Sequence, residues 1–245
     1  MTDGTLTDID LDTLCLFLDF DGTLVDLAPT PDGIAVPAGL PSLLTRLHAR
    51  LDGRLALISG REVAVLDGFI PGYPGDIHGA HGAEWRMGGT YTAHPMAEGS
   101  VVRAAQAQAQ AAAGSLPGLT IETKRTGVVI HYRAVPAAEP HARAIAQMIV
   151  ADAPGMELHP SKLAYEIRPD DVGKADAVAR AMAGQSPGLV PLMIGDDLTD
   201  EAAMVRAMAL GGAGVRVGPG ESVARWRLDD PGAVLDLLTL WADRT

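Results

Sequence analysis

Three short apolar runs, each ending abruptly in polar residues, dominate the sequence. They are residues 14–18, 55–58 and 189–194, and helical patterns lie over residues 41–51, 173–183 and 199–210. A strand that is buried on both faces has a continuous apolar sequence of this kind, as in parallel sheets. The alternation of strands and helices therefore predicts a doubly wound, Rossmann-like α/β sheet. Ligands of such sheets bind beyond the carboxyl ends of the strands, where all three polar clusters fall.

The middle of the chain has a different pattern. An Ala- and Gln-rich segment predicts a helix, and two alternating segments predict strands joined by a turn at 125–127. A second helix and two short strands follow. In chain order these elements are expected at residues 97–114, 120–124, 128–133, 139–153, 156–158 and 163–167. We expect an α+β cap unit at residues 99–169, inserted into a parallel domain of residues 1–98 and 170–245.

The charge balance limits the possible partners. The 245 residues include 31 acidic and 19 basic side chains, which gives a net charge of −12 at pH 7. Nucleic acids and anionic membrane surfaces are bound through basic patches, so we expect neither as a partner. An anionic substrate must instead be bound by a few locally placed cations.

Cysteine content and the lack of long apolar segments favour a cytoplasmic protein. Cys15 is the only cysteine, so no intrachain disulfide can form, and its apolar neighbours predict a buried thiol. The first twelve residues do not have the basic and then apolar organisation of a signal peptide. No apolar run reaches the roughly 18 residues that a membrane span needs. We expect a cytoplasmic monomer with no membrane partner.

The strongest motif is Asp19-Phe20-Asp21-Gly22-Thr23, directly after the first apolar run. Residues two apart in an extended segment point to the same side, so Asp19 and Asp21 converge beyond the strand end. Two carboxylates held this close do not both favour ionisation unless a cation is present. The arrangement suits a nucleophile paired with an acid/base, and the alternative is a polar turn after a strand.

Two further positions indicate a site for an anion. Ser59 follows the second apolar run, where its hydroxyl can donate to a phosphoryl oxygen, although a serine here is also suited to cap the next helix. Lys174 begins a predicted helix, and a cation is unfavourable beside the positive end of the helix dipole. This placement indicates a negative charge to neutralise, and the alternative is a solvated surface lysine.

An acidic cluster follows the third apolar run. It contains Asp196, Asp197, Asp200 and Glu201. Their mutual repulsion requires a cation, and carboxylate oxygens suit Mg²⁺ better than a softer metal. Thr199 is expected to cap the following helix, with Asp200 and Glu201 in its first turn, so part of the cluster has a structural explanation.

In this order the motifs resemble the haloacid dehalogenase-like phosphatases, over the whole parallel domain. The resemblance implies that Asp19 is the nucleophile that becomes an aspartyl-phosphate and that Asp21 is the acid/base. It implies phosphate contacts from Ser59 and Lys174. It also implies a Mg²⁺ site formed by Asp19, Asp21, Asp196, Asp197 and Asp200. Asp21 is expected to contribute its backbone carbonyl, and Asp197 and Asp200 are expected to lie outside the inner ligands.

Further segments narrow the resemblance to the trehalose-6-phosphate phosphatases. They are residues 78–84, 121–124, 129–133, 163–169, 195–201 and 228–231. The resemblance implies hydrolysis of trehalose 6-phosphate, so the expected partner is a phosphorylated disaccharide. The chain departs from the family pattern at one point, because no glycine follows Lys174 directly.

The inserted unit is expected to select the sugar. Glu122 and Lys124 point the same way on one predicted strand, as do His131 and Arg133 on the next. Discriminating among the hydroxyls of a disaccharide takes paired donors and acceptors. Lys124 and Glu166 are expected at the sugar distal to the phosphate, and the alternative for each is a solvated cross-strand ion pair. The full set of expected substrate contacts is Arg61, His81, Glu122, Lys124, Arg133 and Glu166.

Three other functions remain open on the sequence alone. Phosphatases for sucrose phosphate or a glycosyl-phosphoglycerate share the core and differ in the cap. A phosphomutase would have to protect its aspartyl-phosphate from water. A silent binding domain would be free to lose any of the five core residues, which are Asp19, Asp21, Ser59, Lys174 and Asp196.

Overall fold

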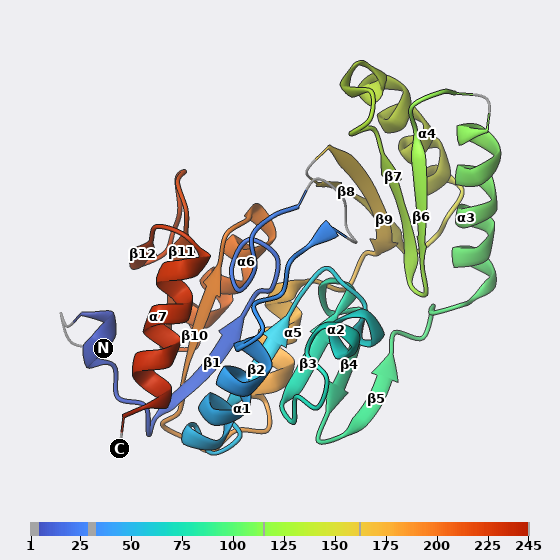
Figure 1. The fold of residues 1–245 in the computed structure, drawn as a ribbon. Helices are drawn as coiled ribbons and strands as arrows, with labels where there is room; N and C mark the ends of the chain where they lie inside the picture. Colours follow the sequence, from blue (N-terminus) through green and yellow to red (C-terminus); the bar gives the residue numbers. More distant parts are fainter. Residues whose placement is uncertain (1–4, 29–32, 115, 162, 245) are drawn as a thin grey trace. The chain divides into compact units, whose positions relative to one another are not determined.

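A computed structural model of the chain describes residues 5–28, 33–114, 116–161 and 163–244 (Figure 1). The chain divides into two compact units, which are described separately. The core unit contains the chain up to Tyr91 and from Gly173 onward, and the inserted unit is Thr92–Val172. Within the described part of the chain, no helix combines the length and apolarity that a membrane span requires.

The core unit is built on an eight-stranded sheet with the order β12-β11-β10-β1-β2-β3-β4-β5. Its strands are β1 (Leu14–Leu18), β2 (Leu55–Ile58), β3 (Asp76–Gly79), β4 (Glu84–Met87), β5 (Thr90–Ala93), β10 (Val190–Gly195), β11 (Ala213–Val217) and β12 (Trp226–Leu228). Neighbouring strands from β12 to β3 pair in parallel, whereas β3 and β4 pair antiparallel. The expected doubly wound α/β class is confirmed.

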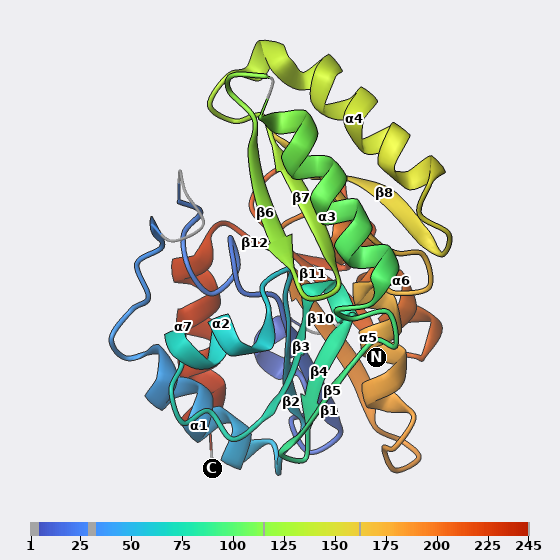
Figure 2. The ribbon, with the colours of Figure 1, turned by 90° about the vertical axis from the view of Figure 1, so that its right-hand side faces the viewer.

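Helices cover both faces of this sheet. They are α1 (Leu40–Arg50), α2 (Val63–Phe69), α5 (Lys174–Met182), α6 (Leu198–Ala209) and α7 (Pro231–Ala242), with short 3₁₀ turns η1 (Leu6–Asp8) and η3 (Ala80–Gly82). Leu14, Leu16 and Leu18 of β1 pack in a cluster with α1 and α7, whereas Cys15 and Phe17 pack in a cluster with α5 and α6. Figure 2 shows the two helix pairs on opposite sides of the sheet. The continuous apolar run of β1 is thus explained by burial on both faces.

The inserted unit contains a four-stranded antiparallel sheet with the order β6-β7-β9-β8. Its elements are α3 (Ser100–Ala113), β6 (Thr120–Lys124), β7 (Gly127–His131), η4 (Pro136–Ala138), α4 (Glu139–Ala151), β8 (Met156–Ser161) and β9 (Ala164–Pro169). The helices α3 and α4 pack on one face, where Ala105 and Ala146 meet Val128, Ile130 and Ile167. Small alanine side chains let the helix backbones approach the sheet closely.

The strand ends of the inserted unit differ from the sequence expectation. β7 ends at His131, so the expected strand position of Arg133 is wrong, and Arg133 lies in the turn that follows. β8 continues to Ser161 instead of ending at residue 158, because its pairing with β9 runs as far as Ser161 and Ala164. Tertiary pairing therefore sets these strand ends, not the local apolar pattern.

Candidate active site

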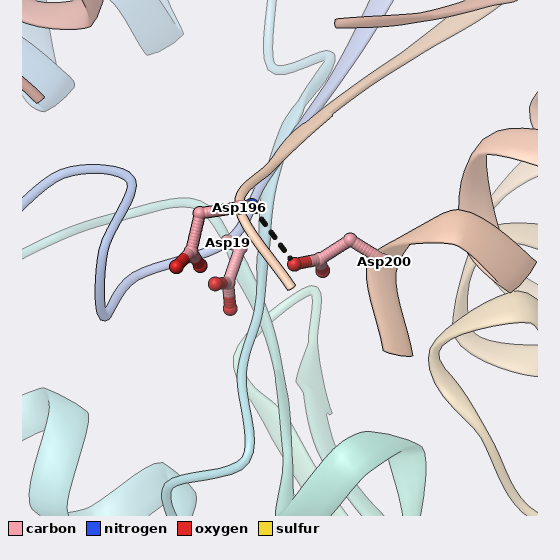
Figure 3. A group of neighbouring side chains, drawn as sticks. All are labelled: Asp19, Asp196 and Asp200. Atoms are coloured by element: carbon pink, nitrogen blue, oxygen red, sulfur yellow. Dashed lines mark hydrogen bonds between the residues drawn. The ribbon is translucent and has the colours of Figure 1, made fainter. Parts of the chain in front are cut away.

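Polar side chains gather at the carboxyl ends of β1 and β10, which are neighbours in the sheet. The Asp19 N–H donates to the carbonyl of Ile194, 3.0 Å away, which holds the end of β1 against the end of β10. Asp19, Asp196 and Asp200 each offer a carboxylate oxygen, and these oxygens lie within 4.8 Å of one another (Figure 3). The structure thus brings together acidic residues from opposite ends of the chain.

Lys174 is the cation of this cluster. Its side chain is buried, and Nζ donates to Oδ1 of Asp19 and to Oδ1 of Asp200, each at 2.7 Å. Burial alone would lower the pKa of Lys174, but the carboxylates of Asp19 and Asp200 outweigh it and raise the pKa above its usual value. Lys174 is therefore charged. Gly173 is the N-cap of α5, and the helix begins at Lys174. The residue after Lys174 is Ala175, so the helix starts here without the glycine that the family pattern has.

One ammonium group does not balance the surrounding carboxylates. Burial raises the pKa of Asp19 well above its usual range, and the nearby charge of Asp200 raises it further. Burial and the charges of Asp200 and Asp197 raise the pKa of Asp196 to about 6. Oδ1 of Asp196 is also buried with no hydrogen-bond partner among the described residues. A buried acceptor and excess negative charge fit a divalent cation with oxygen ligands.

Gly22 lets the chain pass close to this cluster. Its φ of +79° lies in the left-handed region, and a Cβ atom there would come within 2.2 Å of Oδ2 of Asp196. Any side chain at this position would both strain the backbone and displace the Asp196 carboxylate. The position of the Asp196 carboxylate thus requires a glycine at position 22.

Asp197 and Asp200 shape the start of α6. Asp197 is the N-cap and accepts a hydrogen bond from the Thr199 N–H at 2.5 Å, so the expectation that Thr199 caps this helix is wrong. Oδ2 of Asp200 accepts from the backbone N–H groups of Asp196 and Asp197, at 3.1 and 3.0 Å. Both Asp200 oxygens therefore already have partners within the protein. Burial raises the pKa of Asp197, but the Lys174 charge and the Thr199 hydrogen bonds outweigh it and lower the pKa.

Asp21 is paired with Arg61, which follows β2. Nε and Nη2 of Arg61 donate to Oδ2 and Oδ1 of Asp21, each at 2.7 Å. The two side chains are 13% and 28% exposed. A guanidinium that contacts both oxygens of one carboxylate fixes its orientation as well as its charge. The sequence singled out both residues but did not predict their pairing.

Ser59 and His81 lie in the same part of the core unit. The buried Ser59 accepts a hydrogen bond at Oγ from the Arg61 N–H at 3.1 Å, which leaves its hydroxyl hydrogen able to donate. The N-cap of α2 is Glu62, so Ser59 does not cap that helix. The His81 N–H donates to the Ser59 carbonyl at 2.9 Å, and a Cβ atom at Gly60 would lie 2.6 Å from Nε2 of His81.

In the inserted unit, the sheet face opposite α3 and α4 carries charged pairs. Nζ of Lys124 donates to Oε1 of Glu166 at 2.7 Å, and the side chains are only 11% and 6% exposed. Nε2 of His131 lies 2.8 Å from Oε2 of Glu122. This hydrogen bond lowers the pKa of Glu122 against the effect of burial. Glu166 and Glu122 thus each have a basic partner on this face.

Two residues on this face were not singled out by the sequence. Nη2 of the buried Arg168 donates to Nδ1 of His159, 3.1 Å away. Arg168 is two residues after Glu166 on β9, and His159 is the register partner of Glu166 on β8. The period of two along β9 is the one sequence signal that places Arg168 on the face of Glu166.

Comparisons with known proteins identify the family of the chain. The trehalose-phosphatase family profile matches residues 17–231. A probable trehalose-phosphate phosphatase of Sinorhizobium fredii is 40% identical over 213 residues, which cover 86% of this chain and 80% of that protein. The trehalose-6-phosphate phosphatase of Escherichia coli is 37% identical over 216 residues, with coverage of 86% and 80%.

A solved structure supports the same fold. The C-terminal domain of the C. albicans trehalose-6-phosphate phosphatase matches with a TM-score of 0.81 at 23% identity, over 96% of this chain and 93% of that one. At this identity the likeness concerns the fold alone. The family follows from the sequence comparisons: this chain belongs to the trehalose-phosphatase family.

Proposed function

We propose that the chain hydrolyses trehalose 6-phosphate to trehalose and inorganic phosphate through an aspartyl-phosphate at Asp19. The relatives named above are phosphatases, so the enzyme class is that of the phosphoric monoester hydrolases. One observation carries the mechanism. The buried Asp19 carboxylate lies 2.7 Å from the Lys174 ammonium group, and Asp21 follows two residues later.

In the first half of the reaction, a carboxylate oxygen of Asp19 attacks phosphorus. The bond between phosphorus and the sugar oxygen breaks, and Asp21 gives its proton to that oxygen, which releases trehalose. Lys174 and the Ser59 hydroxyl bind the phosphoryl oxygens. Phosphoryl transfer spreads negative charge over these oxygens, so fixed cations and donors lower the barrier.

In the second half, water attacks phosphorus and gives a proton to Asp21. The bond between phosphorus and the Asp19 oxygen breaks, and its electron pair returns to the carboxylate. Inorganic phosphate leaves, and both aspartates are restored. One residue thus serves as acid in the first half and as base in the second.

The acidic cluster is suited to hold Mg²⁺. The proposed ligands are the carboxylates of Asp19 and Asp196 and the backbone carbonyl of Asp21. Asp197 and Asp200 lie around them, because Asp197 caps α6 and both oxygens of Asp200 accept other hydrogen bonds. When bound, Mg²⁺ neutralises the carboxylates and the charge that develops on the phosphoryl group.

Chelation is expected to abolish activity, and added Mg²⁺ is expected to restore it. Because ligand binding stabilises the folded state, Mg²⁺ should also raise the melting temperature. Asp196→Asn removes the carboxylate with the unpartnered buried oxygen. The Mg²⁺ concentration needed to restore activity and to raise the melting temperature should therefore increase at least about tenfold. Phosphate release and thermal melts across a Mg²⁺ titration measure this. Full activity after exhaustive chelation would rule out the metal role.

The charged face of the inserted unit is proposed to bind the sugar distal to the phosphate. Lys124 donates and Glu166 accepts, and the pair is largely buried, which distinguishes it from an ordinary solvated ion pair. Glu122, with its lowered pKa, is proposed as a further acceptor. Arg133, in the turn after β7, and the core-unit residues Arg61 and His81 stay proposed substrate contacts.

Lys124→Ala and Glu166→Ala are expected to lower kcat/KM for trehalose 6-phosphate at least about tenfold while sparing p-nitrophenyl phosphate. Loss of one charge-assisted hydrogen bond costs roughly 1.5–3 kcal/mol. p-Nitrophenyl phosphate has no distal sugar, so it makes no such hydrogen bond and its hydrolysis should not change. The matched control is Arg125→Ala, which breaks an exposed ion pair with Glu98 in the same unit.

The same assay tests the substrate. Wild-type protein should hydrolyse trehalose 6-phosphate with the highest kcat/KM in a panel that includes sucrose phosphate and a glycosyl-phosphoglycerate. Equal losses of the two variants on trehalose 6-phosphate and the small ester would contradict sugar binding by this pair. A preference of the wild type for another sugar phosphate would contradict the substrate.

A further inference from the structure

Arg61 and Asp21 form a two-point contact at the carboxyl edge of the sheet. They follow β2 and β1, which are neighbouring parallel strands. Nε and Nη2 of one guanidinium donate to the two oxygens of one carboxylate, both at 2.7 Å. This planar pairing restricts rotation of the carboxylate, which a single hydrogen bond does not.

The guanidinium and the backbone of Arg61 each have a further contact in the core unit. The guanidinium lies over the ring of Phe69, 5.0 Å from the ring centroid, and Phe69 stacks on Phe20 at 6.0 Å. Phe20 is fully buried, and it stands between Asp19 and Asp21 in the sequence. The Arg61 N–H also donates to Ser59 Oγ. Arg61 is thus a preorganised group, because its stacking partner and its backbone are both anchored in the core unit.

We propose that Arg61 is a positioning residue for Asp21, which sets the plane of the carboxylate that transfers the proton. This inference rests on the proposed function and deepens it. The contact uses one lone pair on each Asp21 oxygen and leaves the other free. The fixed carboxylate can therefore still accept the proton of the attacking water.

The consequence falls mainly on the second half of the reaction. There, water attacks phosphorus, its proton passes to Asp21, and the bond between phosphorus and Asp19 breaks with its electron pair returning to Asp19. Without Arg61 the carboxylate rotates and accepts the proton poorly. p-Nitrophenolate leaves without being protonated, so the first half with p-nitrophenyl phosphate does not need Asp21 as an acid. The aspartyl-phosphate should then accumulate.

Stopped-flow measurement of p-nitrophenolate release tests this. For Arg61→Met, the ratio of the burst rate to the steady rate is expected to rise at least about tenfold over that of the wild type. Asp21→Asn should show the same change. The double variant should be no slower than Asp21→Asn alone, because the two residues act as one unit.

Arg61→Lys covers the case in which Arg61→Met does not fold. Lysine keeps the charge but lacks the planar fork, so a lysine variant that melts at the wild-type temperature should still show the raised burst ratio. A higher KM for every phosphate ester, with an unchanged burst ratio, would overturn the inference and leave Arg61 with the role of a substrate contact alone. If Asp21→Asn itself shows no raised ratio, the proposed mechanism fails instead.

Discussion

Asp19→Asn is expected to lower kcat at least about a thousandfold while leaving the fold intact. The amide cannot attack phosphorus, and it cannot serve a cation as an anionic ligand. Its size matches the carboxylate, and it removes one negative charge from a buried cluster in which burial and Asp200 already disfavour ionisation. Phosphate release from trehalose 6-phosphate and a thermal melt measure the two effects.

The matched control is Asp67→Asn. Asp67 pairs with Arg86 at the surface of the same unit, so this change should leave activity and melting temperature close to the wild-type values. Retention of even about a tenth of the activity by a folded Asp19→Asn would show that the nucleophile is assigned wrongly.

Lys174→Met is expected to destabilise the protein by about 3–5 kcal/mol at pH 7 and to abolish activity. Lys174 donates to both Asp19 and Asp200, and all three side chains are buried. Removing the ammonium group leaves two buried carboxylates facing each other without a cation. Urea unfolding of wild type and variant in metal-free buffer measures the change in the free energy of unfolding.

A second substitution separates charge from packing. Lys174→Met with Asp200→Asn should recover part of the lost stability, because the amide removes one of the two facing charges and can donate to Asp19. A loss below about 1 kcal/mol in the single variant would contradict the charge balance described for this cluster. So would a double variant that is less stable than the single one.

The sequence predicts the parts of the fold that have strong local patterns. The strands β1, β2 and β10 are continuous apolar runs, and the Ala-rich α3 has high helix propensity, so the expected bounds of each lie close to the observed ones. β3, β4 and β11 were not predicted. They are short and contain glycine or alternate weakly, and their pairing with neighbouring strands stabilises them more than local propensity does.

The site was predictable in its residue types but not in its contacts. The Asp-x-Asp spacing predicts from local geometry alone that Asp19 and Asp21 point to the same side. The Arg61 contact to Asp21 spans 40 residues and depends on β2 lying next to β1, which no local pattern states. The expected cap of α6, Thr199, lies two residues after the observed cap, because the backbone conformation at Asp197 decides where the helix begins.

Trapping the covalent intermediate tests the central claim most directly. Wild-type protein is mixed with trehalose 6-phosphate and Mg²⁺, quenched in acid within the first turnover, and reduced with borohydride, which converts an aspartyl-phosphate to homoserine. Mass spectrometry of the peptides should find homoserine at position 19, and none in Asp19→Asn or without substrate. Rapid phosphate release with an unmodified Asp19, or with the phosphoryl group on another residue, would contradict the account.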